Sequence, residues 1–514
     1  MDFAQEKQNG SMLLYLIISI AVFLMVMTPI VANFTGKMQL LKTTIEREKA
    51  FQIAEAGINY YQWHLIEFTD DYQDGTGGEG PYVHDYVDYD IQQTTGQFSL
   101  VITPPLMGGT TIIVQSTGWT NASPNIRRTI TAIYGTASLA SYALLTHDWI
   151  YAWPTESYSG PVHSDNGIRF EGTASSAVTS SVQTTYTDDC NQEYPEADCP
   201  TTATRDAIWA TGPNKTASSP FWSNPTTTVD FTGISTSFSQ IQSSSQMNLP
   251  LSNKQGYSLV FNSDGSLTVH KVLRTTNTGA RFPVTKALSS GTDTGLAYII
   301  GGTDYSSDIC YNANCSGCGQ KGRCFQYTTQ IPSEGLAIYA KENLWVEGTI
   351  KGRVVVATAD ENALNTNPNA AGSSSSLMPN IYISNNIRYS NGEGGAQGSS
   401  ADTLGLLSQG NIIVTKNAPD PLYVDGALLA QNGFVAFPIC YNGGAAKNNV
   451  YFFGSLILHG SWWFNFTNYC GSSFTDGFLY PHFTWDVNLL YYPPPYFPPS
   501  SVSAGLQLQK WTSN

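Results

Sequence analysis

The sequence is poor in charged side chains. Asp, Glu, Lys and Arg make up only 12% of the 514 residues, about half of their usual share in soluble proteins. The formal net charge of -15 is spread thinly, without a long basic run or an acidic block. A basic nucleic-acid footprint is therefore absent. The neutral polar surface supplied by Ser, Thr, Asn, Gly and Tyr is typical of secreted β-rich proteins.

Common catalytic motifs are also missing. The chain contains no GxSxG, no HExxH and no P-loop, and its 7 His residues are scattered singly. His163 with Asp165, or His482, would supply isolated acid–base groups at most. We therefore expect a protein that is not an enzyme and holds no cofactor. The enzymatic alternative is a membrane-tethered β-helix enzyme acting on polysaccharide, which would need Lys, Arg and Asp gathered on one face.

No cysteine precedes residue 190, and the 8 cysteines come in local groups. An even, clustered set that follows a membrane segment predicts disulfides in an oxidising compartment. The central CxxC also raises zinc or an iron–sulfur cluster as an alternative, but a single CxxC in a Gly- and Asn-rich loop favours two local disulfides. The groups are Cys190 with Cys199; Cys310, Cys315, Cys318 and Cys324; and Cys440 with Cys470, the last two expected to join adjacent strands or their loops.

From Ser11 to Gly36 the chain carries no charge and is dense in Leu, Ile, Val and Met. This stretch is long enough to span ~30 Å of hydrocarbon. Apolar positions then continue at a spacing of three or four from Met38 to Leu65. We predict one helix over residues 11–67, about 80 Å long, with residues 11–36 in the membrane and a kink at Pro29.

The beginning of the chain resembles a known family. A short leader ending in Gly10, then Ser11, the apolar stretch and "EREKAFQIAEAGINYYQW" together resemble the N-terminus of type IV pilins, in particular PilX-type minor pilins. The resemblance implies that a prepilin peptidase cuts between Gly10 and Ser11, removing residues 1–10, and that the helix then packs against other pilin subunits. The residues assigned to this packing are Tyr15, Pro29, Phe51, Ala54, Glu55 and Gly57.

Two features depart from the family pattern. Pilins usually carry Glu as the fifth mature residue, where it meets a neighbour's amino terminus, but here that residue is Tyr15. The leader has Lys7 against Asp2 and Glu6, so the positive-inside rule gives no support for the orientation. A subunit with nothing above it would not need the missing acid. Together with a large downstream passenger, this predicts a place at the filament tip.

A small pilin-like sheet is expected over residues 68–137. Three stretches, 96–105, 110–119 and 127–135, alternate apolar and polar residues and are bounded by turn residues, which predicts antiparallel strands packed on the helix. The preceding loop is rich in Gly and Asp. Its carboxylates are a weak calcium candidate, and because their spacing matches no EF-hand we favour a solvated turn. They are Asp70, Asp71, Asp74 and Glu79.

Residues 138–514 change character. Short β-branched or aromatic runs separated by Asn-Gly, Asp-Gly and Gln-Gly turns, without long helices, predict a right-handed parallel β-helix, with a β-sandwich as the alternative. Residues 155–180 and 335–500 resemble the solenoid region of ComZ-like minor pilins, and residues 181–334 remain unassigned. Pro493 to Pro499 is expected to lie over the coil as an extended segment, and residues 505–511 to add a strand.

The function predicted from these features is that of a minor pilin, a structural and adhesive tip component of a type IV pilus or related filament. It would lie in the inner membrane before assembly and outside the cell afterwards, with a surface glycan or DNA as ligand at the tip. The aromatic runs "SWWFNF" and "LLYYPPPYF" offer a sugar-stacking surface, although we favour a role in capping the solenoid core. DNA capture for natural transformation is the alternative, and would need Lys341, Lys351 and Arg353 on one face.

Overall fold

The computed structural model describes residues 9–88, 92–186, 204–229, 231, 234–276, 281–282, 298–299, 303–312, 314–363, 378–392, 402–438, 445–460, 462–467, 475–500 and 506–513. The chain divides into two compact units. Unit 1 consists of Met1–Pro104, Ile112–Tyr134 and Leu508–Asn514, and unit 2 of Pro105–Thr111 and Gly135–Gln507. The fold is mainly β with one long N-terminal helix, which confirms that part of the prediction.

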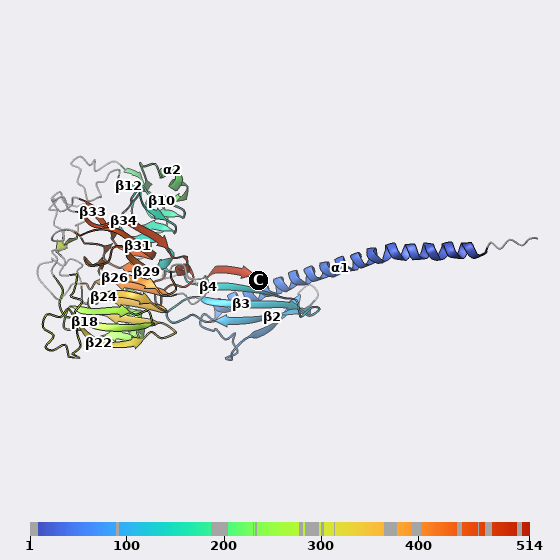
Figure 1. The fold of residues 1–514 in the computed structure, drawn as a ribbon, viewed down its shortest axis with the longest axis horizontal. Coiled ribbons are helices and arrows are strands. Elements are labelled where there is room, and N and C mark those ends of the chain that lie inside the picture. Colours follow the sequence, from blue (N-terminus) through green and yellow to red (C-terminus); the bar gives the residue numbers. More distant parts are fainter. Residues whose placement is uncertain are drawn as a thin grey trace, which may run out of the picture. The chain divides into compact units, whose positions relative to one another are not determined.

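The helix, α1, runs from Asn9 to Glu67 without interruption and contains Pro29 (Figure 1). Its hydroxyl side chains are satisfied within the helix. Ser19 donates to the carbonyl oxygen of Tyr15 at 2.7 Å, and Thr28 donates to that of Leu24 at 2.6 Å. Such internal hydrogen bonds allow a polar side chain to sit in an apolar segment where no water is present.

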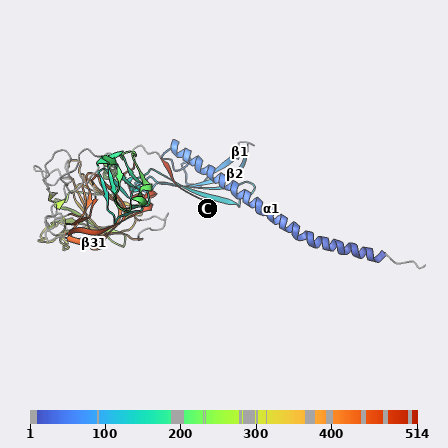
Figure 2. The ribbon, with the colours of Figure 1, turned by 90° about the horizontal axis from the view of Figure 1, so that it is seen from above.

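Unit 1 holds a sheet, antiparallel from β1 to β4, against the second part of α1 (Figure 2). The strand order is β1-β2-β3-β4-β35. The sequence pattern indicates four of these strands, β35 included, but not β1, because the buried side of β1 carries Tyr and His instead of aliphatic residues. The strands are β1 (Tyr82–Asp88), β2 (Gln93–Thr103), β3 (Ile112–Thr120), β4 (Arg127–Gly135) and β35 (Gln507–Ser513).

The last strand differs from the expected domain division. We expected residues 138–514 to form one domain, whereas β35 joins the sheet of unit 1 and Pro105–Thr111 belongs to unit 2. The packing of Trp511 gives the reason. Its ring lies edge-on to the ring of Phe51 of α1, with the centroids 5.7 Å apart, while 41% of Trp511 stays exposed.

Unit 2 is built around two ladders of parallel strands. In ladder A each strand pairs in parallel with the next, although the spatial order is not the chain order. Its strands are β16 (Met247–Leu249), β23 (Leu336–Ala340), β25 (Arg353–Thr358), β27 (Thr403–Ser408), β29 (Leu422–Ala430), β31 (Ala445–Leu458), β5 (Leu144–Thr146), β8 (Val162–Ser164), β11 (Val178–Ser180) and β15 (Trp222–Ser223).

Ladder B is also parallel throughout. Its strands are β17 (Gly256–Phe261), β24 (Leu344–Ile350), β26 (Ile381–Tyr389), β28 (Ile412–Val414), β30 (Val435–Ala436) and β32 (Trp462–Trp463). At one edge β17 pairs antiparallel with β18 (Ser266–Val272), which pairs antiparallel with β22 (Arg323–Gln330). β34 (Thr475–Trp485) pairs in parallel with β31. Figure 1 shows β24, β26, β29, β31 and β34 one above another.

The remaining elements are short. A third parallel set joins β6 (Ile150–Ala152), β9 (Ile168–Phe170) and β14 (Ile208–Trp209). The others are η1 (Leu139–Ser141), β7 (Ser157–Tyr158), β10 (Thr173–Ala174), β12 (Thr184–Tyr186), β13 (Thr204–Asp206), α2 (Lys215–Ser218), η3 (Ser219–Phe221), α3 (Ile234–Ser244), β19 (Arg281–Phe282), β20 (Tyr298–Ile299), β21 (Ile309–Cys310), β33 (Asn465–Thr467) and η4 (Val487–Leu490).

An asparagine ladder fixes the turns that lead into ladder B. The Asn343 side-chain oxygen accepts the Asn380 backbone N–H at 2.9 Å, and the Asn380 oxygen accepts that of Asn411 at 2.8 Å. The Asn411 oxygen accepts the Phe434 N–H at 3.1 Å. Because each side chain satisfies a backbone donor of the next turn, the repeated Asn residues hold the turns in register.

Both faces of ladder A are covered in its central strands. Every residue of β25 and β27 is buried, so their central residues, 354–357 and 404–407, are apolar or glycine throughout instead of alternating with polar residues. One face belongs to the large aliphatic core shared with ladder B. On the other, Phe238 and Ile241 of α3 pack in a cluster with Phe497 of the proline-rich segment.

Candidate functional site

The first part of α1 presents an uncovered apolar surface in unit 1. Its large apolar side chains from Met12 to Ile45 are between 37% and 81% exposed. Among the described residues, α1 is the one helix that is long and apolar enough to cross a membrane, with a mean hydropathy of 2.6 over its best window. An apolar surface of this size requires lipid or other apolar helices around it. Tyr15 belongs to it and is 69% exposed.

The second part of α1 is sealed against the sheet by small residues. Ala50, Ala54 and Gly57 lie on one helix face at spacings of four and three residues, and all three are buried. A Cβ on Gly118 of β3 would lie 2.4 Å from both the Ala50 carbonyl oxygen and the Ala54 nitrogen. A Cβ on Gly57 would lie 2.3 Å from Ser116 Oγ. The small residues of the "AFQIAEAG" motif therefore set the closest approach of helix and sheet.

A buried carboxylate marks the start of the sealed part. The Glu46 side chain is buried, and its Oε2 accepts a hydrogen bond from the Thr120 hydroxyl at 2.5 Å. Its Oε1 lies 3.7 Å from Lys49 Nζ. We did not single out Glu46 from the sequence, although it lies one helical turn before Ala50 on the same face. Glu55, in contrast, is exposed.

The acidic loop of unit 1 is bound to histidines. Asp71 Oδ2 lies 3.1 Å from His64 Nε2, and Asp74 Oδ2 lies 2.6 Å from His84 Nε2. The backbone N–H of Gln73 hydrogen-bonds Asp71 and, ahead of His64, lowers the pKa of this carboxyl.

The calcium candidates do not converge in this loop. Asp70 and Glu79 are exposed. Within the described part of the chain, no three His, Cys, Asp or Glu side chains are placed to hold a metal ion. The two histidine–aspartate pairs instead fasten the loop to α1 and β1.

In unit 2, Asp165 joins several segments through hydrogen bonds. Its Oδ2 lies 3.0 Å from His147 Nδ1, and its Oδ1 lies 3.2 Å from His163 Nε2. Oδ1 also accepts the Ser181 hydroxyl at 3.1 Å and the Val229 N–H at 2.9 Å. Burial opposes ionisation of Asp165, but the bonds from His163, Val229 and His147 outweigh it and lower its pKa.

The arrangement is unlike a nucleophilic triad. Ser181 Oγ and the Asp165 carboxylate both face Nε2 of His163, at 3.2 Å each, while Nδ1 faces Thr179 Oγ1 at 2.8 Å. A triad needs the acid and the nucleophile on opposite ring nitrogens. This network therefore connects separate segments of unit 2, and its geometry is not that of a nucleophilic triad.

His147 and His459 were missed in the sequence. Their rings lie 4.6 Å apart, beside Phe231. Burial, followed by the neighbouring His147, lowers the pKa of His459. The two histidines are far apart in the chain and meet because β5 pairs with β31, which no local motif indicates. The third sequence candidate, His482, stacks on Tyr451 at 4.5 Å.

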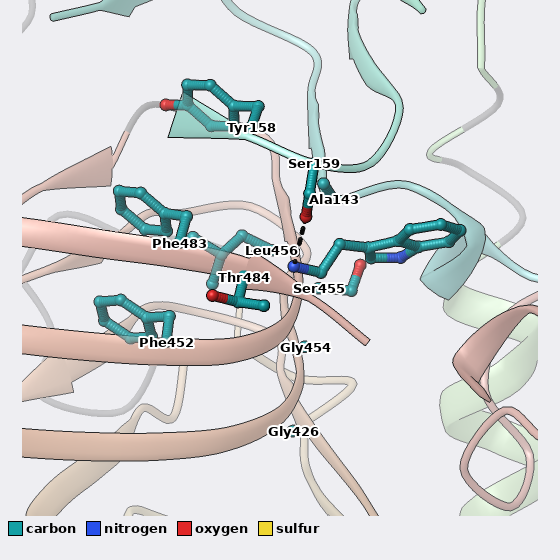
Figure 3. Close-up of a pocket in the computed structure, with 11 residues that line it drawn as sticks. Ala143, Tyr158, Ser159, Gly426, Phe452, Gly454, Ser455, Leu456, Phe483 and Thr484 are labelled. Carbon is teal, nitrogen blue, oxygen red and sulfur yellow. Dashed lines mark hydrogen bonds between the residues drawn. The ribbon is translucent and has the colours of Figure 1, made fainter. Parts of the chain in front are cut away.

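The pocket drawn in Figure 3 is too small for a ligand. Its volume is about 10 Å³, roughly the space that one water needs. Phe452, Phe483 and Tyr158 lie in a column beside it, with centroids 5.4 Å and 5.9 Å apart. Ser159 Oγ accepts the backbone N–H of Trp485 at 3.3 Å. These contacts serve packing.

The aromatic run "SWWFNF" points inward where the structure describes its side chains. Trp462 and Phe464 are buried in the main core, and the Trp462 ring contacts Phe483 at 4.8 Å. These two rings are therefore not available for stacking on a sugar. That this run caps the solenoid core stays a prediction.

The central cysteines form two disulfides, Cys310–Cys318 and Cys315–Cys324. Their Cα atoms are 5.5 Å and 5.7 Å apart, respectively. Cys190, Cys199, Cys440 and Cys470 lie outside the described residues. The CxxC sulfurs are thus used in covalent bonds, which leaves no thiolate there for zinc or an iron–sulfur cluster.

The three basic residues considered for DNA binding do not form one exposed set. Arg353 is buried, and its guanidinium donates to the Pro493 carbonyl at 2.8 Å. Burial lowers the pKa of Arg353 to about 10. Lys341 pairs with Glu361 at 2.9 Å. DNA binding would need all three basic residues on one face. Arg353 does not meet this condition, because it is buried and anchors the proline-rich segment.

One buried histidine makes the stability of the fold depend on pH. His270 of β18 is 4% exposed, and its Nδ1 has no hydrogen-bond partner among the described residues. Burial, and then the charge of Arg323, lower its pKa from 6.5 to about 4. The fold thus favours the neutral ring. Since the unfolded chain binds the proton more readily, this contribution to stability is lost as the pH falls from 6.5 towards 4.

We expect His270→Phe to remove this loss. Between pH 7 and pH 4 the unfolding free energy of the wild type should fall by about 2 to 3 kcal/mol more than that of the variant. Denaturant unfolding at a series of pH values measures the difference, with the exposed His482→Phe as control. Parallel pH profiles for wild type and His270→Phe would show that His270 does not titrate with folding.

No protein-family model matches the chain, and no curated protein matches it. Among solved structures, it is similar to the competence-associated pilin ComZ from Thermus thermophilus. The sequence identity is 12%, the match covers 91% of this chain and 97% of the other, and the TM-score is 0.29. At this level the similarity establishes neither a shared fold nor a shared function.

Proposed function

We propose that this chain is a PilX-type minor pilin of a type IV pilus or related filament. The observation that carries the proposal is the two-part character of α1. Its residues from Met12 to Ile45 form an exposed apolar surface, and the helix continues without a break into a part sealed on a sheet by Ala50, Ala54 and Gly57. A simple signal anchor has no need for such a continuous, shape-matched helix.

In this proposal the apolar part of α1 first lies in the inner membrane. A prepilin peptidase cuts between Gly10 and Ser11, and the helix then packs against other pilin subunits. In pilins, an acid at this position neutralises a neighbour's buried amine, which matters because an unpaired charge in apolar surroundings is unfavourable. Here Tyr15 stands in place of that acid. A subunit at the filament tip does not need that acid, so Tyr15 supports a tip position.

Unit 2 would be the part presented at the surface, as a right-handed parallel β-solenoid. This proposal is supported by the parallel pairing of strands within ladder A and within ladder B, and by the asparagine ladder between successive turns. A β-sandwich would instead pack antiparallel sheets face to face. We assign unit 2 an adhesive role and no enzymatic one. The Asp165 network lacks triad geometry, which argues against a nucleophilic triad at that place.

Sheared, purified filaments provide the test. We expect the protein in them to begin at Ser11 by mass spectrometry, and Gly10→Phe to retain the leader and be absent from filaments, whereas Asn9→Ala is processed normally. Gold coupled to Lys254→Cys, an exposed position, should mark one end of each filament.

Normal processing of Gly10→Phe, or a different N-terminus in filaments, would contradict the pilin assignment. Regular gold decoration along the shaft would overturn the tip position while leaving the pilin assignment intact.

A further inference from the structure

Unit 2 contains a groove of about 300 Å³ between α3 and the proline-rich segment. Ser237 and Gln240 of α3 line it, as do Tyr496 and Phe497 of the proline-rich segment. The lining also includes Gly108 and further glycine, threonine and serine residues from the segments 109–110 and 136–138. At this size the groove has room for one sugar ring or a group of similar bulk.

The lining of the groove is free of charge. It contains no Asp, Glu, Lys, Arg or His, and instead combines hydroxyl groups, one amide, proline rings and two aromatic rings. Gln240 is exposed, so its amide is available both to donate and to accept hydrogen bonds. Arg353 lies outside the lining, because it is buried, with its guanidinium 3.6 Å from the Cβ position of Gly109 and donating to the Pro493 carbonyl. A charged ligand would therefore lose its hydration here without gaining an exposed counter-charge from the lining. The chemistry therefore fits a neutral ligand with several hydroxyl groups.

Tyr496 is held in an unusual backbone conformation at this groove. Its φ of 55° lies in the left-handed region, which is unfavourable for a tyrosine. The Tyr496 N–H donates to the Gly108 carbonyl at 2.6 Å, and a Cβ on Gly108 would lie 2.6 Å from the tyrosine ring. A strained residue that persists in this way often belongs to a functional site. The half-buried ring provides a flat apolar face for a sugar.

We propose that this groove binds one neutral sugar residue of a surface glycan. The Tyr496 ring stacks on the sugar, and the Gln240 amide hydrogen-bonds its hydroxyl groups. The inference rests on the proposed adhesive function and names the ligand class and its site. Nucleic acid is the less suitable occupant, because its phosphates would meet no cation in the lining.

The test uses the full chain in a zwitterionic detergent that has no sugar headgroup. Methyl glucoside, methyl galactoside and N-acetylglucosamine are titrated by saturation-transfer NMR, and we expect at least one to bind with a dissociation constant of about 1 mM. Tyr496→Gly should weaken binding about tenfold or more, because it removes the stacking ring. Glycine also accepts the left-handed conformation, so the backbone strain is relieved.

A second variant keeps the test independent of folding at residue 496. Gln240→Trp should fill the groove and abolish binding, whereas Ser239→Trp, at an exposed neighbouring position outside the lining, should bind as the wild type does. Equal binding by Gln240→Trp and Ser239→Trp, or no binding of any sugar by the wild type, would overturn the proposal.

A single-stranded oligonucleotide tests nucleic acid as the occupant, and the filament assay separates this inference from the pilin assignment. Binding of a single-stranded oligonucleotide that Gln240→Trp abolishes would overturn the sugar assignment and assign the groove to nucleic acid. If filaments contain the protein beginning at Ser11 but the protein binds no sugar, only this inference is refuted. If the protein is absent from filaments, the pilin assignment is refuted.

Discussion

Gly118→Val is expected to displace α1 from the sheet of unit 1 and to lower the free energy of unfolding of this unit by about 4 kcal/mol or more. The added Cβ would lie 2.4 Å from Ala50 O and Ala54 N, which are backbone atoms of a regular helix. No side-chain rotation relieves such an overlap. The helix must move away as a whole, and the buried contacts of Ile53 and Ile58 are lost with it.

Hydrogen exchange of β2 and β3 in the full-length protein measures this effect. Protection should be lost in Gly118→Val and retained in Gly78→Val, because a Cβ on Gly78 meets nothing nearer than Thr76 Oγ1 at 3.9 Å. Adding Ala54→Gly should not rescue Gly118→Val, since the overlap is with the helix backbone. Wild-type protection in Gly118→Val would show that the helix and sheet do not approach as closely as described.

The long helix could be predicted from the sequence because its determinants are local. An uncharged run followed by apolar residues at helical spacing leaves no other regular structure open to residues 11–67. The strands of unit 1 were only partly predictable. The inward-facing residues of β1 include Tyr82 and His84, so the strand lacks the alternation of aliphatic and polar residues that would indicate it. β35 belongs to unit 1 because it lies beside β4 in the sheet and Trp511 contacts Phe51, and its own sequence pattern does not reveal these partners.

The sequence indicates the short strands and turns of unit 2, but not the order in which the strands lie side by side. Apolar runs and Asn-Gly or Asp-Gly turns indicate short strands, and the Asn residues indicate repeated turns. Which strands become neighbours depends on pairing between distant segments. β31 is followed in ladder A by β5, from near the start of the unit, so the sequence order does not give the spatial order.

The same cause limits the prediction of sites. His163 and Asp165 lie together in the sequence, but His459 reaches their network only through the pairing of β31 with β5. The groove likewise combines Gly108, Gln240 and Tyr496 from three separate segments. None of these residues has a local signature, because neutral polar and aromatic residues are common throughout this chain.

Gly454→Ala is expected to break the contact between β29 and β31 and to lower the free energy of unfolding of unit 2 by about 4 kcal/mol. The two strands pair in register, and Gly426 lies directly against Gly454. Gly454 has a φ of 149°, and a Cβ there would lie 1.9 Å from the Gly426 carbonyl oxygen. The substitution therefore combines a strained backbone conformation with a steric overlap that only strand separation relieves.

A matched variant separates these two effects. Gly392→Ala also places alanine at a positive φ, 76°, but nothing lies within 4 Å of its Cβ. It should lower the free energy of unfolding by only about 1 to 2 kcal/mol, so the difference of about 2 to 3 kcal/mol between the variants reports the packing of one strand on the next. Denaturant unfolding and hydrogen exchange of β29 and β31 measure both. Equal destabilisation would mean that the strands tolerate a side chain between them, which contradicts the close stacking on which the proposed solenoid depends.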